Sequence, residues 1–221
     1  MPRTLIIALR LIGLLIAAIF ISSLFNPQLL LFPYVRMIGQ TTVYSDVPIP
    51  DAAAAVIDSA DALVSRSALF EPGVLTHPVF LTDGGWRWHV LSFQTLKAFA
   101  QTRPLSRAIV VNRSNLARDK VWAGPAGERD LSAVIAHERT HALIRAKFGI
   151  LADRSYPRWV VEGYCDHVAG SSTLSDEAAA TLVAEDRRTP ALFYYQSRKR
   201  VEAVLQENGG SVEQMFSSAE R

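Results

Sequence analysis

The sequence predicts an α+β protein in which a small sheet is followed by a mostly helical C-terminal half. Two short apolar runs, 77–83 and 86–93, are separated by a pair of glycines and predict a β-hairpin. The run 107–112 predicts one more strand. From Asp130 onward the patterns are helical. Strands that come first and helices that come later are typical of the α+β class.

The helices are predicted from apolar spacing and from their end signals. Residues 51–70 place Ala54, Ile57 and Val64 along one side. Residues 130–149 begin at an aspartate suited to the N-cap and end at a glycine. Three more helices are expected: one directly after Pro157, one capped by Ser175, and one over residues 190–210.

The N-terminus carries a different signal. Residues 5–25 are apolar except for Arg10, and a membrane-spanning helix needs roughly 20 such residues. Arg3 and Arg10 precede the next cation, Arg36, so the positive-inside rule places the N-terminus in the cytoplasm and the rest outside. The alternative is a cleaved signal peptide, which the lack of a clean small-residue cleavage pattern disfavours.

The chain is therefore expected to contain a single-pass anchor (1–25), a linker or stalk (26–50) and one domain (51–221). Four prolines and the lack of periodicity favour a linker over 26–50. A net charge of +2 is no argument for nucleic-acid binding. Cys165 is the single cysteine, which excludes an internal disulfide framework and a cysteine-rich zinc module.

The stretch VIAHERTHALI, residues 134–144, predicts a metal site on an apolar helix. Residues four apart are neighbours on a helix, so His137 and His141 point the same way and can share one zinc ion. Glu138 is rotated by about 100°, so it is expected beside the metal as a general base. A chance pattern on a buried helix is the alternative interpretation.

Catalytic zinc has three protein ligands and one open position, so a third ligand is expected nearby. Glu162 lies on the next helix, which leaves room for that helix to pack back on the first. Asp166 follows it by four residues, on the same face, where it can accept the other N–H of a ligating histidine. The alternative is a solvated face, which the apolar residues around both carboxylates disfavour.

HERTH followed by WVVEGY resembles the gluzincin metallopeptidases, a peptidase MA-like group that includes thermolysin and the aminopeptidase N type. The resemblance covers roughly residues 105–210 and is specific around 137–166. It implies a zincin-like fold, zinc bound by His137, His141 and Glu162, Glu138 as the base, and Asp166 behind a histidine. The exopeptidase signature GxMEN is missing before the zinc helix, so the aminopeptidase assignment does not carry over.

Hydrolysis also needs a donor for the developing oxyanion. The segment from Tyr194 resembles a degraded form of the helix that supplies a tyrosine in aminopeptidase N-type enzymes. Tyr194 shares a helical face with Val201, whereas Tyr195 falls with charged residues. Tyr194 is therefore the expected donor, and a tyrosine of the core is the alternative.

The predicted function is a membrane-anchored zinc metallopeptidase that acts on peptides or proteins on the extracytoplasmic side. The strand at 107–112 is expected to offer an edge on which an extended substrate pairs. The rival hypothesis is a non-catalytic, membrane-tethered binding domain that retains the zincin fold. Glu138 argues against the rival, because a scaffold needs no base there.

Overall fold

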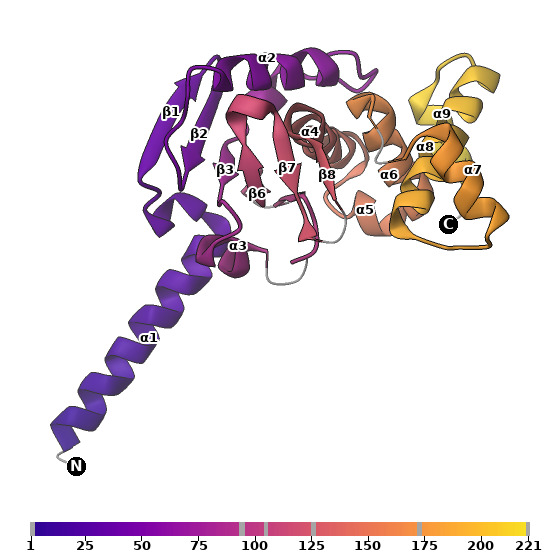
Figure 1. The fold of residues 1–221 in the computed structure, drawn as a ribbon. Coiled ribbons are helices and arrows are strands. Elements are labelled where there is room, and N and C mark those ends of the chain that lie inside the picture. The colour runs from indigo at the N-terminus through magenta and orange to yellow at the C-terminus, as the bar shows by residue number, and fades with distance from the viewer. Residues whose placement is uncertain (1–2, 93–95, 104–105, 125–126, 172–173, 220–221) are drawn as a thin grey trace.

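The computed structural model describes residues 3–92, 96–103, 106–124, 127–171 and 174–219. They form an α+β domain from which the first helix projects alone (Figure 1). The helices are α1 (Arg3–Phe25), α2 (Ala53–Val64), α3 (Trp86–Leu91), α4 (Leu131–Phe148), α5 (Ala152–Ser155), α6 (Arg158–Ala169), α7 (Asp176–Ala184), α8 (Pro190–Glu207) and α9 (Val212–Ser218). Three short 3₁₀ helices are η1 (Pro27–Leu30), η2 (Pro72–Thr76) and η3 (Leu116–Arg118).

A five-stranded sheet has the order β1-β2-β3-β5-β4, and a three-stranded antiparallel sheet has the order β6-β7-β8. In the larger sheet β2, β3 and β5 are parallel, while β1 and β4 run antiparallel along its two edges. The strands are β1 (Tyr34–Ile38), β2 (Thr41–Ser45), β3 (Val79–Leu81), β4 (Ala100–Thr102), β5 (Ile109–Val111), β6 (Arg113–Asn115), β7 (Lys120–Trp122) and β8 (Glu128–Asp130).

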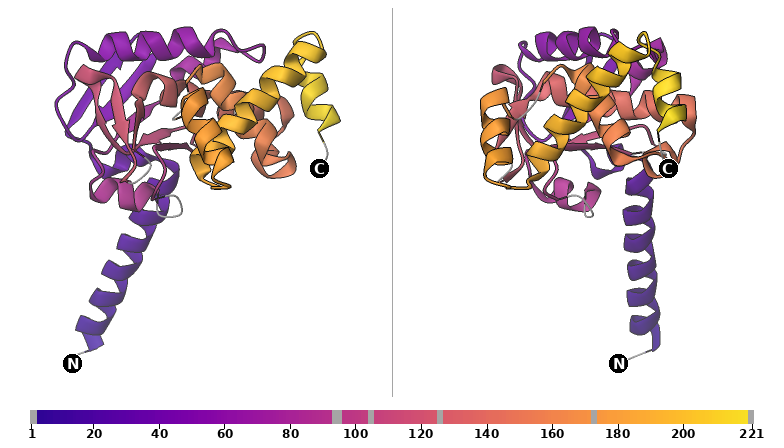
Figure 2. Two further views of the ribbon diagram at one scale, coloured as in Figure 1. Left: turned by 45° about the vertical axis from the view of Figure 1, so that its right-hand side comes forward. Right: turned by 90° about the vertical axis from the view of Figure 1, so that its right-hand side faces the viewer.

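The larger sheet is covered on both faces because successive side chains of a strand point to opposite sides. Val79 and Leu81 of β3 pack with α2 and α4. Phe80, between them, packs on the other face with Trp88 and Leu91 of α3. The last helices lie beyond α4, on its side away from this sheet (Figures 1 and 2).

Helix α4 runs through the centre of the domain and is buried almost all round from Leu131 to Ile144. Asp130 occupies its N-cap position, as predicted, but makes no capping bond with its side chain. Asp119 caps the helix instead, by accepting hydrogen bonds from the backbone N–H and the hydroxyl of Ser132 at 2.7 and 2.6 Å. The start of α4 is thus bound to the turn between η3 and β7.

Helices α6 and α8 pack closely at Gly163. A Cβ atom at this position would lie 2.5 Å from the carbonyl oxygen of Ser197 and 2.8 Å from Cγ2 of Val201. Both contacts are far below van der Waals separation, so the bare glycine lets the two helices approach. Because Glu162 and Tyr194 lie on these two helices, this contact also sets their spacing.

The predicted hairpin over 77–93 is wrong in its second half. Residues 79–81 form β3, but residues 86–91 form helix α3, and residue 93 lies outside the described residues. The reason is that β3 is already paired on both sides, with β2 and with β5, so no edge is free for a hairpin partner. Gly84, at φ +69°, turns the chain out of the sheet.

The prediction of a linker or stalk over 26–50, partly packed on the domain, is wrong for residues 34–45, which form the hairpin of β1 and β2. The inward side chains of β2 are Thr41, Val43 and Ser45, which do not read as an apolar stripe. Thr41 is nevertheless satisfied inside the domain: its hydroxyl donates to the Leu75 carbonyl at 2.8 Å and accepts from Arg139 at 2.6 Å.

The strand predicted at 107–112 exists as β5, but it is not an edge. It lies between β3 and β4, and β4 forms the edge of the sheet instead. A strand of three residues such as β4 is too short to show an alternating pattern. The predicted helices at 51–70, 130–149 and 190–210 are confirmed, with the first ending at Val64, and so are the helix after Pro157 and the helix capped by Ser175.

None of the helices in the described part of the chain combines the length and the hydropathy that a membrane span requires.

Replacing Gly163 by alanine is expected to lower the free energy of unfolding by about 1–3 kcal/mol, since the added methyl overpacks the contact between α6 and α8. Denaturant unfolding of the purified chain measures the change. Gly73→Ala is the control, because nothing lies within 4 Å of its added Cβ. Equal stability of the two variants would contradict the close-packing role of Gly163.

Candidate metal centre

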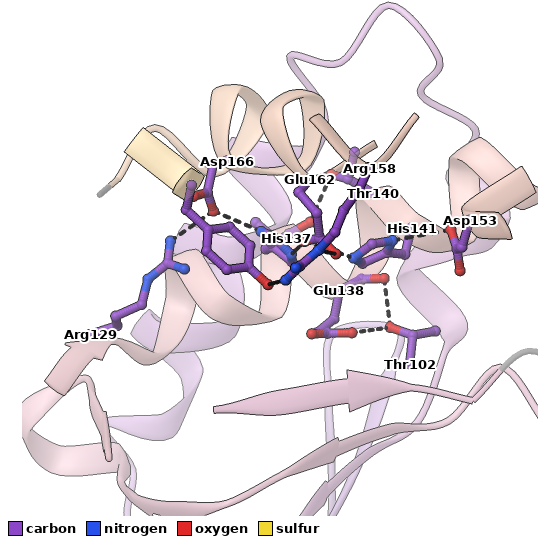
Figure 3. A network of polar contacts seen from close by, with 12 residues as sticks. Thr102, Arg129, His137, Glu138, Thr140, His141, Asp153, Arg158, Glu162 and Asp166 are labelled. Atoms are coloured by element: carbon purple, nitrogen blue, oxygen red, sulfur yellow. Dashed lines mark hydrogen bonds and ion pairs between the residues drawn. The ribbon is translucent and has the colours of Figure 1, made fainter. Parts of the chain in front are cut away.

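The three predicted ligands come together between α4 and α6. His137 and His141 lie one turn apart on α4, with ring centroids 5.0 Å from each other. Glu162 on α6 places Oε2 at 3.4 Å from Nε2 of His137 and at 3.8 Å from Nε2 of His141. Figure 3 shows the three side chains turned toward one another.

This spacing fits a shared metal ion. Ligand atoms about 2.0–2.1 Å from a tetrahedral zinc ion lie about 3.3–3.4 Å from each other. The distances from Glu162 are close to that value. Two imidazoles and a carboxylate are also a donor set that zinc accepts.

A buried carboxylate holds the far side of His137. Nδ1 of His137 donates to Oδ1 of Asp166 at 2.8 Å, and Arg129 donates to the same oxygen at 3.0 Å. Burial opposes the charge of Asp166, but these two partners outweigh it and keep the pKa of its carboxyl below the usual value. Nε2 is therefore left to face Glu162. The structure thus places Asp166 behind a histidine, where the sequence predicted it.

A second carboxylate, which the sequence analysis missed, holds His141. Asp153 lies on the short helix α5, and its Oδ1 is 3.3 Å from Nδ1 of His141. Arg145 donates to its Oδ2 at 2.7 Å. Burial raises the pKa of Asp153, but the contacts with His141 and Arg145 lower it by more. The pKa of this carboxyl therefore lies below its usual value. Each histidine is therefore oriented by a carboxylate at its Nδ1 atom.

Cys165 lies close to the two histidines. It is fully buried on α6, and within the described residues it forms with His137 and His141 a cluster whose ligand atoms all lie within 4.8 Å of one another. These three side chains can hold a metal ion. Burial, with the nearby carboxylates of Glu162 and Glu138, raises the pKa of the thiol well above its usual value. Without a metal the thiol is therefore neutral.

Glu138 lies next to the centre but outside the ligand cluster. It is buried, and its Oε2 lies 2.7 Å from the hydroxyl of Thr102 at the end of β4 (Figure 3). Glu138 and His137 line a cavity of about 740 Å³. Its wall also includes residues 98–100, from the segment that leads into β4, and Tyr194.

Tyr194 lies on α8 against the same cavity, with its ring centroid 6.4 Å from that of His137. Its hydroxyl oxygen accepts a hydrogen bond from Arg158 at 3.2 Å, so its own hydrogen is free to point elsewhere. Burial raises the pKa of Tyr194 to about 12, which keeps the phenol protonated. Tyr195 points away and donates to Asp176 at 2.8 Å on the surface.

No protein-family model matches this chain, and no match was found among curated proteins or among solved structures.

Asp166→Asn and Asp153→Asn are each expected to weaken zinc binding about 10–100-fold, because each removes a carboxylate that orients a histidine. Competition with a chromogenic chelator measures the affinity. Asp58→Asn, on the exposed side of α2, is the control. If both site variants bind zinc as tightly as the control, these two carboxylates do not support a metal centre.

Proposed function

We propose that this chain is a zinc-dependent peptidase of the gluzincin type. The observation that carries the proposal is the convergence of His137, His141 and Glu162, each histidine backed by its own carboxylate. Glu138 follows His137 in the sequence, but its side chain lines the cavity instead of joining the ligands. A metal centre beside an unligated carboxylate and a cavity is the arrangement that hydrolysis requires.

Zinc bound by the three ligands would supply Lewis acidity and a water acidic enough to lose its proton near neutral pH. The other tasks fall to the side chains. Glu138 accepts the proton of the attacking water and later returns it to the leaving amine. Tyr194 donates its free O–H to the oxygen of the scissile carbonyl as negative charge develops there.

The edge strand β4 supports a peptide as the substrate. Asn112 donates its backbone N–H to the Phe99 carbonyl at 2.9 Å, and Arg103 donates to Ala108 at 2.8 Å. By the alternation of an antiparallel pair, the peptide groups of Ala100, between them, point away from β5. They are in position to pair with an extended peptide in the cavity, which Ala100 also lines.

Cys165 favours a second candidate function. If its thiolate joined the two histidines and Glu162, the metal would have four protein ligands and no open position, as in structural zinc sites. The chain would then be a binding domain that uses metal for stability. Glu138, with its carboxylate beside the cavity, supports the peptidase over this alternative.

Membrane attachment through residues 5–25 stays a prediction from the sequence. Helix α1 projects from the domain (Figure 2). Its side chains Leu11, Leu14 and Ile16 are more than half exposed. These exposed apolar side chains are the support for an anchor.

Glu138→Gln is expected to keep zinc and the fold while lowering the cleavage rate about 10²–10⁴-fold, because the amide cannot accept a proton. Glu162→Gln is the matched comparison, since it weakens a ligand and should lose zinc together with activity. Zinc content is measured by elemental analysis of the purified chain, and cleavage by digestion of a peptide library.

Two results would count against these roles. Loss of zinc from Glu138→Gln as readily as from Glu162→Gln would show that base and ligand are misassigned. Zinc in both variants with an unchanged cleavage rate would mean that the measured activity does not belong to this site.

Tyr194→Phe is expected to lower kcat about 10²–10³-fold, because the hydroxyl donor to the developing oxyanion is lost. Tyr195→Phe removes the neighbouring hydroxyl, which bonds to Asp176 on the surface, and should leave kcat unchanged. Steady-state cleavage of one peptide by both variants measures the difference. Equal rates for the two variants would place the oxyanion donor elsewhere.

A further inference from the structure

We infer that Thr102 is a positioning residue that holds Glu138 in its catalytic orientation and joins it to the edge strand. The inference rests on the proposed peptidase function. Thr102 is the last residue of β4, and Glu138 lies 36 residues later, on α4. Both side chains are buried, so their contact is shielded from water.

One hydroxyl reaches both ends of Glu138. Oγ1 of Thr102 lies 2.7 Å from the backbone carbonyl oxygen of Glu138 and 2.7 Å from its carboxylate Oε2 (Figure 3). A carbonyl and an ionised carboxylate only accept, so the hydroxyl donates a shared hydrogen bond to both. Because one hydroxyl binds both the backbone carbonyl and the carboxylate of Glu138, it restricts the side-chain torsions of this residue. The second carboxylate oxygen, Oε1, is left to take the proton.

The backbone of Thr102 makes a second link to the metal centre. Its carbonyl oxygen accepts from Arg145 at 3.3 Å, and Arg145 holds Asp153, the partner of His141. Thr102, at the end of the edge strand, therefore contacts both Glu138 and Arg145, the arginine that binds Asp153. A peptide paired on β4 is held at a set distance from Glu138.

The chemistry at this position calls for threonine. Its β-branched side chain has few χ1 rotamers, which holds the hydroxyl toward α4. Valine has nearly the same shape but no donor, so it would leave a buried carboxylate oxygen without its partner. Serine keeps the donor on a less restricted side chain. Comparing the valine and serine variants therefore separates the effect of the hydrogen bond from the effect of side-chain packing.

The test compares Thr102→Val and Thr102→Ser in the purified full-length chain, on one peptide that the wild type cleaves. Thr102→Val should lower kcat about 10–100-fold, the usual effect of a misplaced catalytic group, while KM and zinc content stay near the wild-type values. Thr102→Ser should restore most of kcat. A merely structural role would instead change KM, zinc content and the melting temperature, with no rescue by serine.

Wild-type kcat in Thr102→Val, or a loss of kcat together with zinc, would overturn the inference. Glu138→Gln in the same assay reports on the proposed function separately, since an unchanged rate there rejects the peptidase mechanism itself. In that case crystal structures of the two Thr102 variants decide. A Glu138 carboxylate displaced in the valine variant alone shows that Thr102 positions this side chain, although its catalytic purpose is then rejected, and an unmoved carboxylate overturns the positioning role as well.

Discussion

Two hydrogen bonds, from Nδ1 of His137 to Asp166 and from Nδ1 of His141 to Asp153, determine which nitrogen each histidine presents. With Nδ1 engaged, both Nε2 atoms face the gap between α4 and α6, where Glu162 reaches them. Arginines on the outer side of each aspartate keep these carboxylates ionised and in place. A buried group of acids and imidazoles is costly unless every member is paired, and here each one is.

The rest of the domain holds the two helices in register. Helix α4 is buried almost all round from Leu131 to Ile144, so its rotation is determined by α2 and the sheet on one side and by α6 on the other. Gly163 lets α8 approach α6, and this brings Tyr194 to the wall of the cavity. The edge strand β4 completes the opposite wall and supplies Thr102 to the base. Glu162, Tyr194 and Thr102 thus come from three different elements, α6, α8 and β4, around the three site residues of α4.

The helical half of the fold and the central residues of the site could be predicted, because the signals are local. His137 and His141 are four apart, and Glu162 and Asp166 are four apart on the next helix. The sheet was harder, since its strands are short and β2 turns polar side chains inward. Asp153 and Thr102 could not be found, because their roles depend on how the short helix α5 and the edge strand β4 pack on α4. No spacing in the sequence records such contacts.

We propose that α4 and α6 build a catalytic metal centre with two histidines and Glu162. A crystal structure of the zinc-loaded chain, with anomalous scattering measured at the zinc edge, tests it most directly. We expect one zinc ion held by Nε2 of His137, Nε2 of His141 and a carboxylate oxygen of Glu162, with an open position toward the cavity. A site without zinc, or a zinc ion closed off by Sγ of Cys165, would contradict it.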